Sequence, residues 1–233
     1  MLFNSLKLTA KLIALTSGIL LCNTAHSESI EAIDAAALYG TETTYSIYRK
    51  GKAVGQHKLK IKTGDNNRVD VSVDSKITIR VLRVPVFKFS YVSEEIWENN
   101  ELRSVDSTTT TNKKIEIAIL SNSDGSSTLQ NNDGDKQEPR IKFATNHWHI
   151  GAVEQSILFN TVKGTLANVV VEKTGKENLR IGDVNLPVTH FKYSGDITAE
   201  SWYDDNNRWV KLAFLGSDGS QITYVIDNPK QGK

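Results

Sequence analysis

The segment Asn146-His147-Trp148-His149 is the first place where residue types and spacing suggest chemistry. Two histidines separated by one residue lie on the same side of an extended segment, where both imidazoles can coordinate one divalent metal ion. No acidic residue at a fixed spacing completes such a ligand set, so we predict no metal site. The alternatives are a polar-tipped wall of a ligand pocket and a structural turn in which the rings only pack.

A pair of adjacent carboxylates, Asp204 and Asp205, lies between Trp202 and Trp209. Paired catalytic carboxylates must converge on one substrate atom, whereas neighbouring residues on a turn diverge. Asp and Asn side chains favour turns by bonding to their own backbone. The segment therefore predicts a hairpin with Trp202 and Trp209 close together across it, rather than an acid–base pair.

Other catalytic signatures are missing from the sequence. It contains no G-x-S-x-G elbow, phosphate-binding P-loop, G-x-G-x-x-G or H-E-x-x-H motif. The single cysteine, Cys22, lies in a segment that we expect to be removed, which excludes thiol chemistry from the mature protein. We predict no catalytic residues and no cofactor, and a non-catalytic protein is the preferred interpretation.

The first 27 residues have the order of a secretory signal peptide. Lys7 and Lys11 precede an apolar run of 11 residues, 12–22, which is too short to span a bilayer, and Ala25-His26-Ser27 supplies a cleavage site. Leu21 occupies the position where a lipoprotein signal needs a small residue, so we do not expect lipid anchoring at Cys22. The prediction is export to the periplasm with cleavage after Ser27.

Charge and hydropathy limit the partners. The chain has 28 Lys and Arg against 27 Asp and Glu, so no sequence-wide basicity favours nucleic acid. No second apolar run approaches membrane length, and we predict no transmembrane segment in the mature chain.

The elements that must position these residues are predicted by hydrophobic periodicity. Beyond Thr41 apolar and polar residues alternate, as in Val69–Asp74 and Ile115–Ile119, and turn residues such as Gly64–Asn67 separate the runs. Roughly a dozen such runs predict a mainly β protein, in which one curved antiparallel sheet forms an incompletely closed barrel.

Only two stretches predict helix. Ser29–Leu38 has a helical pattern that Ser29 can cap and Gly40 can end, and a second short helix is expected near 153–159. The polar segment Asn131–Pro139 is expected to be a loop. With no linker or change in composition, residues 28–233 are expected to form a single antiparallel β domain.

Several blocks together resemble a known family. They are the hairpin Tyr45–His57 (Y-x-I-Y-x-x-G-x-x-V-G), Thr109–Lys113, Asn146–Trp148, Ser201–Asp205 and Ser217–Ser220. In this order they resemble a domain-of-unknown-function family of secreted proteobacterial β proteins. The family is distantly similar in style to periplasmic lipoprotein carriers, whose curved sheet wraps an apolar cavity. This similarity implies a fold and no catalytic role.

The preferred function is binding or carrying an apolar ligand, such as a lipid or acyl chain, in the lumen of the curved sheet. One alternative is an envelope accessory or structural protein that contacts another protein through an exposed edge or aromatic patch. Another is an enzyme acting on a hydrophobic or glycan substrate. The expected ligand-binding residues are Trp148, His147, His149, Phe87, Phe89, Tyr91 and Trp202.

Overall fold

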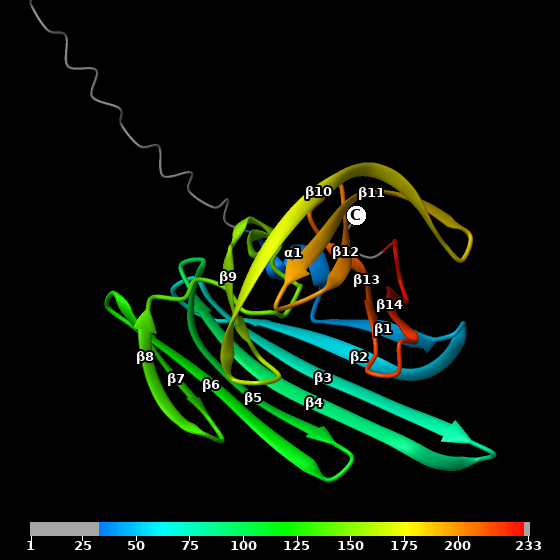
Figure 1. The fold of residues 1–233 in the computed structure, drawn as a ribbon. Coiled ribbons are helices and arrows are strands. Elements are labelled where there is room, and N and C mark those ends of the chain that lie inside the picture. Colours follow the sequence, from blue (N-terminus) through cyan, green and yellow to red (C-terminus); the bar gives the residue numbers. More distant parts are fainter. Residues whose placement is uncertain (1–32, 231–233) are drawn as a thin grey trace, which may run out of the picture. The chain divides into compact units, whose positions relative to one another are not determined.

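Fourteen strands, each antiparallel to its neighbours, make up most of residues 33–230, which are the residues described by this computed structural model. The strands form one sheet in the order β8-β7-β6-β5-β4-β3-β2-β1-β14-β13-β12-β11-β10-β9 (Figure 1). The pairing of β1 with β14 joins the two halves of the chain. The two outermost strands, β8 and β9, do not pair with each other, so the barrel is incompletely closed, as predicted.

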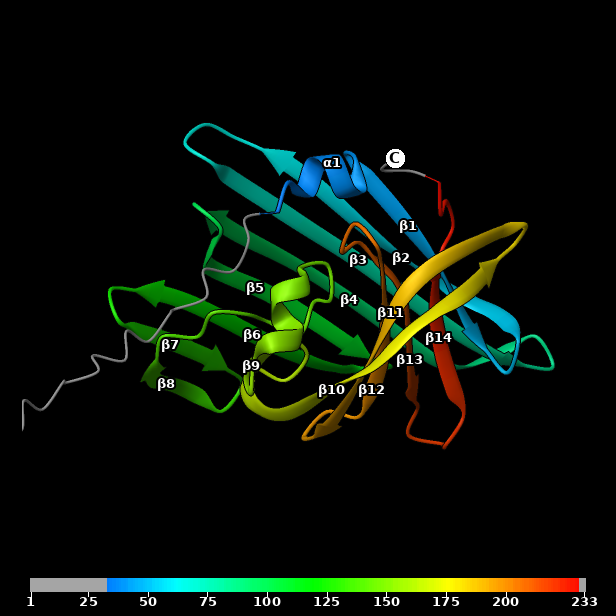
Figure 2. The same cartoon turned by 90° about the horizontal axis from the view of Figure 1, so that it is seen from above.

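The first half of the sheet consists of eight strands: β1 (Glu42–Arg49), β2 (Lys52–Thr63), β3 (Arg68–Val81), β4 (Val84–Glu98), β5 (Glu101–Thr111), β6 (Lys114–Ser123), β7 (Ser126–Asn131) and β8 (Gly134–Pro139). The second half consists of six: β9 (Ile157–Asn160), β10 (Thr165–Ile181), β11 (Val184–Gly195), β12 (Ala199–Asp204), β13 (Trp209–Leu215) and β14 (Gln221–Ile226). Figure 2 shows the chain between β8 and β10 lying over the concave face of the first half.

Alternation along the strands separates an inner from an outer face. On β3 the side chains of Val71, Val73, Ser75 and Ile77 are buried, while the residues between them carry polar or charged side chains. Bulges interrupt the ladders at five places, including Ile79/Arg80. Because a bulge increases local twist and bends its strand, these positions help the sheet to curl.

The sheet has two different ends. At the closed end, where β2 turns into β3 and β4 turns into β5, Trp97, Phe143, Trp148 and His149 pack together. The helix α1 (Ala35–Tyr39) also lies at this end, because the Tyr39 hydroxyl donates to the backbone oxygen of Trp148 at 2.6 Å. At the open end β1 turns into β2, β3 into β4 and β5 into β6.

The helix predictions were partly wrong. The helix α1 begins at Ala35 with Asp34 as its N-cap, so residues 33–34 of the predicted helix are not helical, and Gly40 caps its end as expected. Ser29 and the predicted signal peptide 1–27 lie outside the described residues. The predicted helix near 153–159 is instead the 3₁₀ helix η1 (Ile150–Glu154) followed by strand β9.

Strand pairing explains both corrections in the middle of the chain. The β9 backbone pairs with β10, and Phe159 also bridges to Ala144, so extended geometry satisfies backbone groups that a helix would have to bond internally. Likewise Asn131–Pro139, expected to be a loop, contains a two-residue turn and the polar edge strand β8.

Candidate functional site

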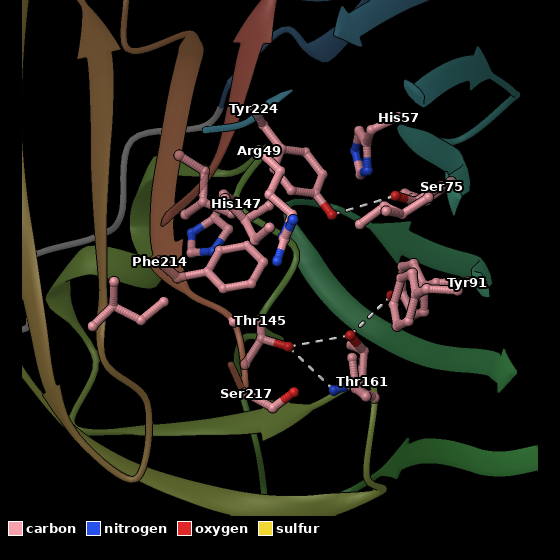
Figure 3. A pocket seen from close by; sticks show the side chains of 18 of the residues that line it. Arg49, His57, Ser75, Tyr91, Thr145, His147, Thr161, Phe214, Ser217 and Tyr224 are labelled. Atoms are coloured by element: carbon pink, nitrogen blue, oxygen red, sulfur yellow. Dashed lines mark hydrogen bonds between the residues drawn. The ribbon is translucent and has the colours of Figure 1, made fainter. Parts of the chain in front are cut away.

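A pocket of about 870 Å³ opens between the concave face of β1–β4 and the strands β13 and β14 (Figure 3). Leu59 and Val73, which are 1% and 4% exposed, mark its inner end. Val86 and Leu215, which are 55% and 68% exposed, mark its mouth. Burial thus decreases toward the open end of the sheet, where a ligand would enter.

The register of the strands arranges the pocket floor in rows. One row of polar side chains crosses β1 to β5, with Tyr45, His57, Ser75, Tyr91 and Thr109 as successive cross-strand partners. All five are buried. Side chains on one face repeat every second residue, so the next rows toward the mouth can be read from the same register.

Those next rows are mainly apolar. Ile77 pairs with Phe89, and Ile79 pairs with Phe87; all four residues line the pocket. The opposite wall is also apolar, with Leu212 and other residues of β13 and β14 facing this floor. The pocket therefore combines a polar inner row with a hydrocarbon-like passage to the mouth.

Trp209 forms the roof above the polar row. Its indole stacks on Tyr45 with ring centroids 4.2 Å apart and meets the His57 ring edge-on at 5.4 Å, while the Tyr224 ring is tilted beside it at 6.4 Å. His147 approaches from the segment before η1, with its ring 5.8 Å from that of Trp209. The backbone of this segment is held by the Tyr203 hydroxyl, which donates to the His147 oxygen at 2.9 Å.

His57 and His147 are the unusual polar groups of the pocket. Neither imidazole is hydrogen-bonded to another described residue, and both line the pocket (Figure 3). Burial and, to a smaller extent, the nearby His147 lower the pKa of His57 from its ordinary 6.5 to about 3, and Asp74 opposes the shift. Burial alone lowers the pKa of His147 to about 4. Both rings are therefore neutral near pH 7 and offer a donor and an acceptor nitrogen.

A second polar cluster lies where β4 meets the segment after β8. The Tyr91 hydroxyl lies within hydrogen-bond distance of Asn146 Oδ1 at 2.9 Å and of Thr161 Oγ1 at 2.8 Å. The Thr161 hydroxyl is in turn 3.1 Å from the Thr145 hydroxyl, so Tyr91, Thr161 and Thr145 form a connected set (Figure 3). Burial raises the pKa of Tyr91 to about 12, so this hydroxyl stays protonated.

Glu95 lies behind this cluster, away from the pocket lining. Its Oε2 accepts hydrogen bonds from the indole N–H groups of Trp97 and Trp148, each at 2.8 Å, and its Oε1 accepts from the Asn146 amide. Burial raises the pKa of the carboxyl above its ordinary value, and these three hydrogen bonds oppose the shift. The carboxyl thus organises the closed end rather than facing a ligand.

The mouth is bordered by an ion pair. The Arg49 guanidinium pairs with Asp218, and its Nε donates to Ser220 Oγ at 2.8 Å. The hydrogen bonds from Ser220 and Arg49 hold the pKa of Asp218 well below its usual range. This contact ties the end of β1 to the turn between β13 and β14.

The structure brings together five of the seven side chains expected to bind a ligand. Phe87, Phe89, Tyr91, His147 and Trp148 all line the pocket. Trp148 forms part of its inner end, since its indole is 3% exposed and packs edge-on against Trp97. It does not lie as a flap over the mouth.

His149 and Trp202 lie elsewhere. The His149 ring stacks on Trp97 in the closed end, so it diverges from His147 instead of sharing a side with it. Trp202 stacks on His190 at 4.3 Å, with the Lys211 ammonium 4.0 Å from the centre of its indole. It faces away from the pocket that Trp209 covers, which corrects the expectation that the two indoles meet across the hairpin.

Sequence reasoning missed His57, Ser75, Trp209 and Tyr224 as pocket residues. Strand parity could have found Ser75, which lies two positions from Val73 and Ile77 on an otherwise apolar inner face. The pairing of β1 with β14, which brings Tyr224 to the pocket, has no local signal in the sequence. Within residues 33–230 no cluster of three or more His, Cys, Asp or Glu could hold a metal ion.

Comparisons with known proteins identify the fold and, separately, the family. Among the helices of the described residues, none has the length and apolarity needed to cross a membrane. No curated protein matches the chain. A crystal structure of a β-barrel-like protein of domain of unknown function DUF1849 from Brucella abortus matches with a TM-score of 0.55 and 11% identity. The match covers 79% of this chain and 94% of that one, and it shows the fold alone.

The sequence pattern of a second family matches more directly. It covers residues 45–227, from the polar row on β1 to the residue after β14, and so includes every strand that lines the pocket. The chain therefore belongs to the family described as domain of unknown function DUF6134.

Proposed function

We propose that this protein binds a lipid or acyl chain in the pocket, with the hydrocarbon part along the apolar rows and an uncharged polar group at the inner polar row. The observation that carries the proposal is a pocket of about 870 Å³ whose lining is mainly apolar. Ligand pockets usually measure about 300–1,000 Å³, and a completely filled sheet interior would leave no such space.

The energetics favour a long hydrocarbon chain. Each buried methylene contributes about 0.8 kcal/mol, so about a dozen methylenes exceed the cost of losing translational freedom and ordering the chain. Ile77, Phe89, Ile79 and Phe87 provide continuous apolar contacts from the inner row to the mouth.

The inner end suits an uncharged polar group. Neutral imidazoles of His57 and His147 can each donate one hydrogen bond and accept one, which matches a hydroxyl, a carbonyl or an ester. A charged head group would lose its hydration there without an opposite charge to replace it. The polar row thus supports a ligand with a neutral polar function rather than a purely hydrocarbon one.

The same groups favour binding over catalysis. A general base works best when its pKa is near the operating pH, whereas burial lowers the pKa of His57 to about 3 and of His147 to about 4. Neither imidazole is hydrogen-bonded to a hydroxyl nucleophile or an orienting carboxylate within the described residues. This arrangement favours a binding site.

Edge pairing with another protein receives less support. The edge strand β8 carries Asp135, Lys136 and Glu138 and ends at Pro139, features that disfavour strand addition. The other edge strand, β9, is short and its Phe159 is bridged by Ala144. Export to the periplasm remains part of the proposal, and the intact mass of the secreted protein would check cleavage after Ser27.

The test places a large side chain in the passage. Ile79→Trp adds an indole beside Phe87 at the half-buried part of the pocket, and Thr78→Trp, on the other face of the same strand, is the matched control. With a fluorescent fatty-alcohol probe, we expect Ile79→Trp to weaken binding by about tenfold or more, equivalent to the contacts of one or two methylenes. Thr78→Trp should leave binding unchanged.

Lipids that copurify with the protein give an independent readout. Native mass spectrometry should detect a bound acyl-containing molecule in the parent and less of it in Ile79→Trp. Failure of the parent to bind any of the fatty alcohol, fatty acid or alkane probes would contradict the proposal. If Ile79→Trp and Thr78→Trp bind the probe equally well, the ligand must bind outside this pocket.

A further inference from the structure

The three hairpins of the open end concentrate positive charge. Residues 49–53, 80–88 and 111–117 contain eight basic side chains and one acidic one, although basic and acidic residues are nearly balanced in the whole chain. Arg49 and Lys114 have ion-pair partners, Asp218 and Glu116. Within residues 33–230 no salt bridge involves the other six basic residues, which are Lys50, Lys52, Arg80, Arg83, Lys88 and Lys113.

Apolar side chains project from the middle hairpin, between these basic residues. Leu82 at its tip is 93% exposed, and Val81, Val84 and Val86 are each more than half exposed. Figures 1 and 2 both show the tip of the β3–β4 hairpin on the same side of the molecule as the β1–β2 tip. An exposed aliphatic tip surrounded by cations is unusual on a protein surface that faces only water.

The backbone makes the choice of residues more unusual. Leu82 and Arg83 both have positive φ, 48° and 70°, as a two-residue hairpin turn requires. Asn and Gly adopt this conformation readily, whereas a Leu or Arg is strained there. Asn-Gly would make the turn more stable, so local stability does not explain a leucine and an arginine at the tip.

The hairpin is also a wall of the pocket mouth. Val86 and Phe87 line the pocket, and Val84 and Leu82 continue from them to the tip. An apolar ligand that leaves along this hairpin could pass directly into an apolar phase that the tip touches. The pocket mouth and the exposed tip therefore belong to the same hairpin.

We propose that the open end docks on the surface of an anionic phospholipid membrane, with Leu82 entering the boundary of the acyl chains and Arg80, Arg83 and Lys88 contacting the lipid phosphates. Membranes offer both an apolar layer and a dense negative surface at the depth of one side chain. This docking goes beyond ligand binding and does not require an occupied pocket.

The test measures partition of the purified protein onto vesicles. Vesicles of phosphatidylcholine with phosphatidylglycerol should bind the protein at least about tenfold more tightly than phosphatidylcholine alone, because several cations each contribute a fewfold gain. Raising the salt to about 0.5 M should remove most of this difference by screening.

Asparagine substitutions test the tip without straining it. Leu82→Asn should weaken binding by about tenfold, the loss expected for one leucine leaving an apolar layer. Arg83→Asn should weaken it by about fivefold and reduce the salt dependence. Val170→Asn removes another exposed aliphatic side chain, and Lys62→Asn another exposed cation without a salt bridge; both controls should leave binding unchanged.

Three outcomes would overturn the proposal. They are equal binding to both kinds of vesicle, vesicle binding that Leu82→Asn does not change, and equally tight binding to soluble polyglutamate with no effect of Leu82→Asn. The last result would assign the open end to an acidic macromolecule. Because fatty-alcohol binding is measured without vesicles, failure of ligand binding and failure of membrane docking remain separate results.

Discussion

Tight turns with positive φ join the strands at both the closed and the open end of the sheet, but the two ends place different residues in them. At the closed end the turns use Asn66, Asn67, Asn99 and Asn100, all with positive φ, a conformation that asparagine tolerates. At the open end the β3–β4 turn uses Leu82 in the same conformation, with its side chain in solvent. The β3–β4 turn thus departs from the preferences of the backbone, whereas Gly51 and Asn112 in the other two turns of the open end follow them.

The buried polar side chains of the closed end and of the pocket also differ, in how completely they are hydrogen-bonded. At the closed end the buried polar atoms of Glu95 and His149 are satisfied: Glu95 accepts three hydrogen bonds, and His149 Nδ1 accepts the N–H of Gly151 at 3.0 Å. Toward the open end, His57 and His147 have no such partners, although they are also buried. The closed end is complete without a ligand, whereas the pocket leaves hydrogen-bonding capacity for one.

This contrast indicates where stability and function reside. The plug of aromatic rings fixes the position of the segment 145–150, and that segment supplies His147 to the pocket. The positive-φ strain of the β3–β4 turn and the unpaired imidazoles of the pocket lie outside this plug, and they are tolerated because the closed end holds the sheet together. Substitutions at the two ends should therefore change the free energy of unfolding by different amounts and, for some pairs, in opposite directions.

Trp148→Ala should produce the largest effect. Its indole is 3% exposed, packs against Trp97 and donates a hydrogen bond to Glu95 at 2.8 Å. We expect the free energy of unfolding in urea to fall by about 3–5 kcal/mol, the usual range for deleting a buried aromatic side chain. Leu82→Ala at the open end should change it by less than about 0.5 kcal/mol.

The same variant distinguishes a plug from a lid. Trp148→Phe keeps much of the ring packing but removes the N–H donor, so it should lose less stability than Trp148→Ala. A small loss of stability in Trp148→Ala, together with strongly weakened probe binding, would contradict the plug and indicate that Trp148 covers the ligand instead.

The second largest effect is expected from acidification, which should lower the free energy of unfolding through His57. An unfolded histidine takes up a proton below pH 6.5, whereas burial holds the pKa of folded His57 at about 3, so the unfolded state binds more protons between these values. The stability contributed by neutral His57 is complete above pH 6.5 and is lost as the pH falls. From there to about pH 4.5 we expect a loss on the order of 2 kcal/mol from this residue.

The measurement is urea unfolding as a function of pH. In His57→Phe the loss of stability between pH 6.5 and about 4.5 should be smaller than in the parent by that amount, because one proton-binding site disappears from the unfolded chain. His149→Phe should differ by also lowering stability at pH 7, since it removes the acceptor of the Gly151 N–H. Identical pH profiles of the parent and His57→Phe would show that folding does not lower the pKa of His57.

Much of the fold follows from period-two alternation. The inner residues of β3 and β4 could be read from the sequence, because each strand has one buried and one exposed face. On β6 the apolar alternation of Ile115–Ile119 lies on the outer side, since Ile115 and Ile117 are 56% and 39% exposed, whereas Ala118 and Leu120 are buried. The strand β8 could not be read in this way, since Gly134–Pro139 has no buried apolar side chain to produce an alternation. The strand β9 was mistaken for helix because Leu158 and Phe159 are adjacent and both buried.

The site was harder to predict than the strands. Phe87, Phe89 and Tyr91 share a face of one strand, and so the sequence alone grouped them. To predict the polar row, one would need to know the registers of four strand pairs. To predict that Trp209 covers this row, one would also need the long-range pairing of β1 with β14. His149 shows the limit of spacing arguments, because the backbone around Trp148 is not a regular strand and turns the two imidazoles apart.

The smallest expected effect comes from exchanging turn residues between the ends. Leu82→Asn should raise the free energy of unfolding by about 1 kcal/mol, because asparagine relieves the positive-φ strain and the exposed leucine makes little packing contact. Asn99→Leu, at a φ of 52° in the closed end, should lower it by a similar amount. For a chain of this length 1 kcal/mol corresponds to about 2–4 °C in Tm, which thermal unfolding can resolve.

If Leu82→Asn were instead destabilising, Leu82 would have to make a stabilising contact in the isolated protein, and its exposure could no longer be attributed to an external partner. Opposite signs for the two substitutions would show that the open end keeps its leucine at a cost in stability.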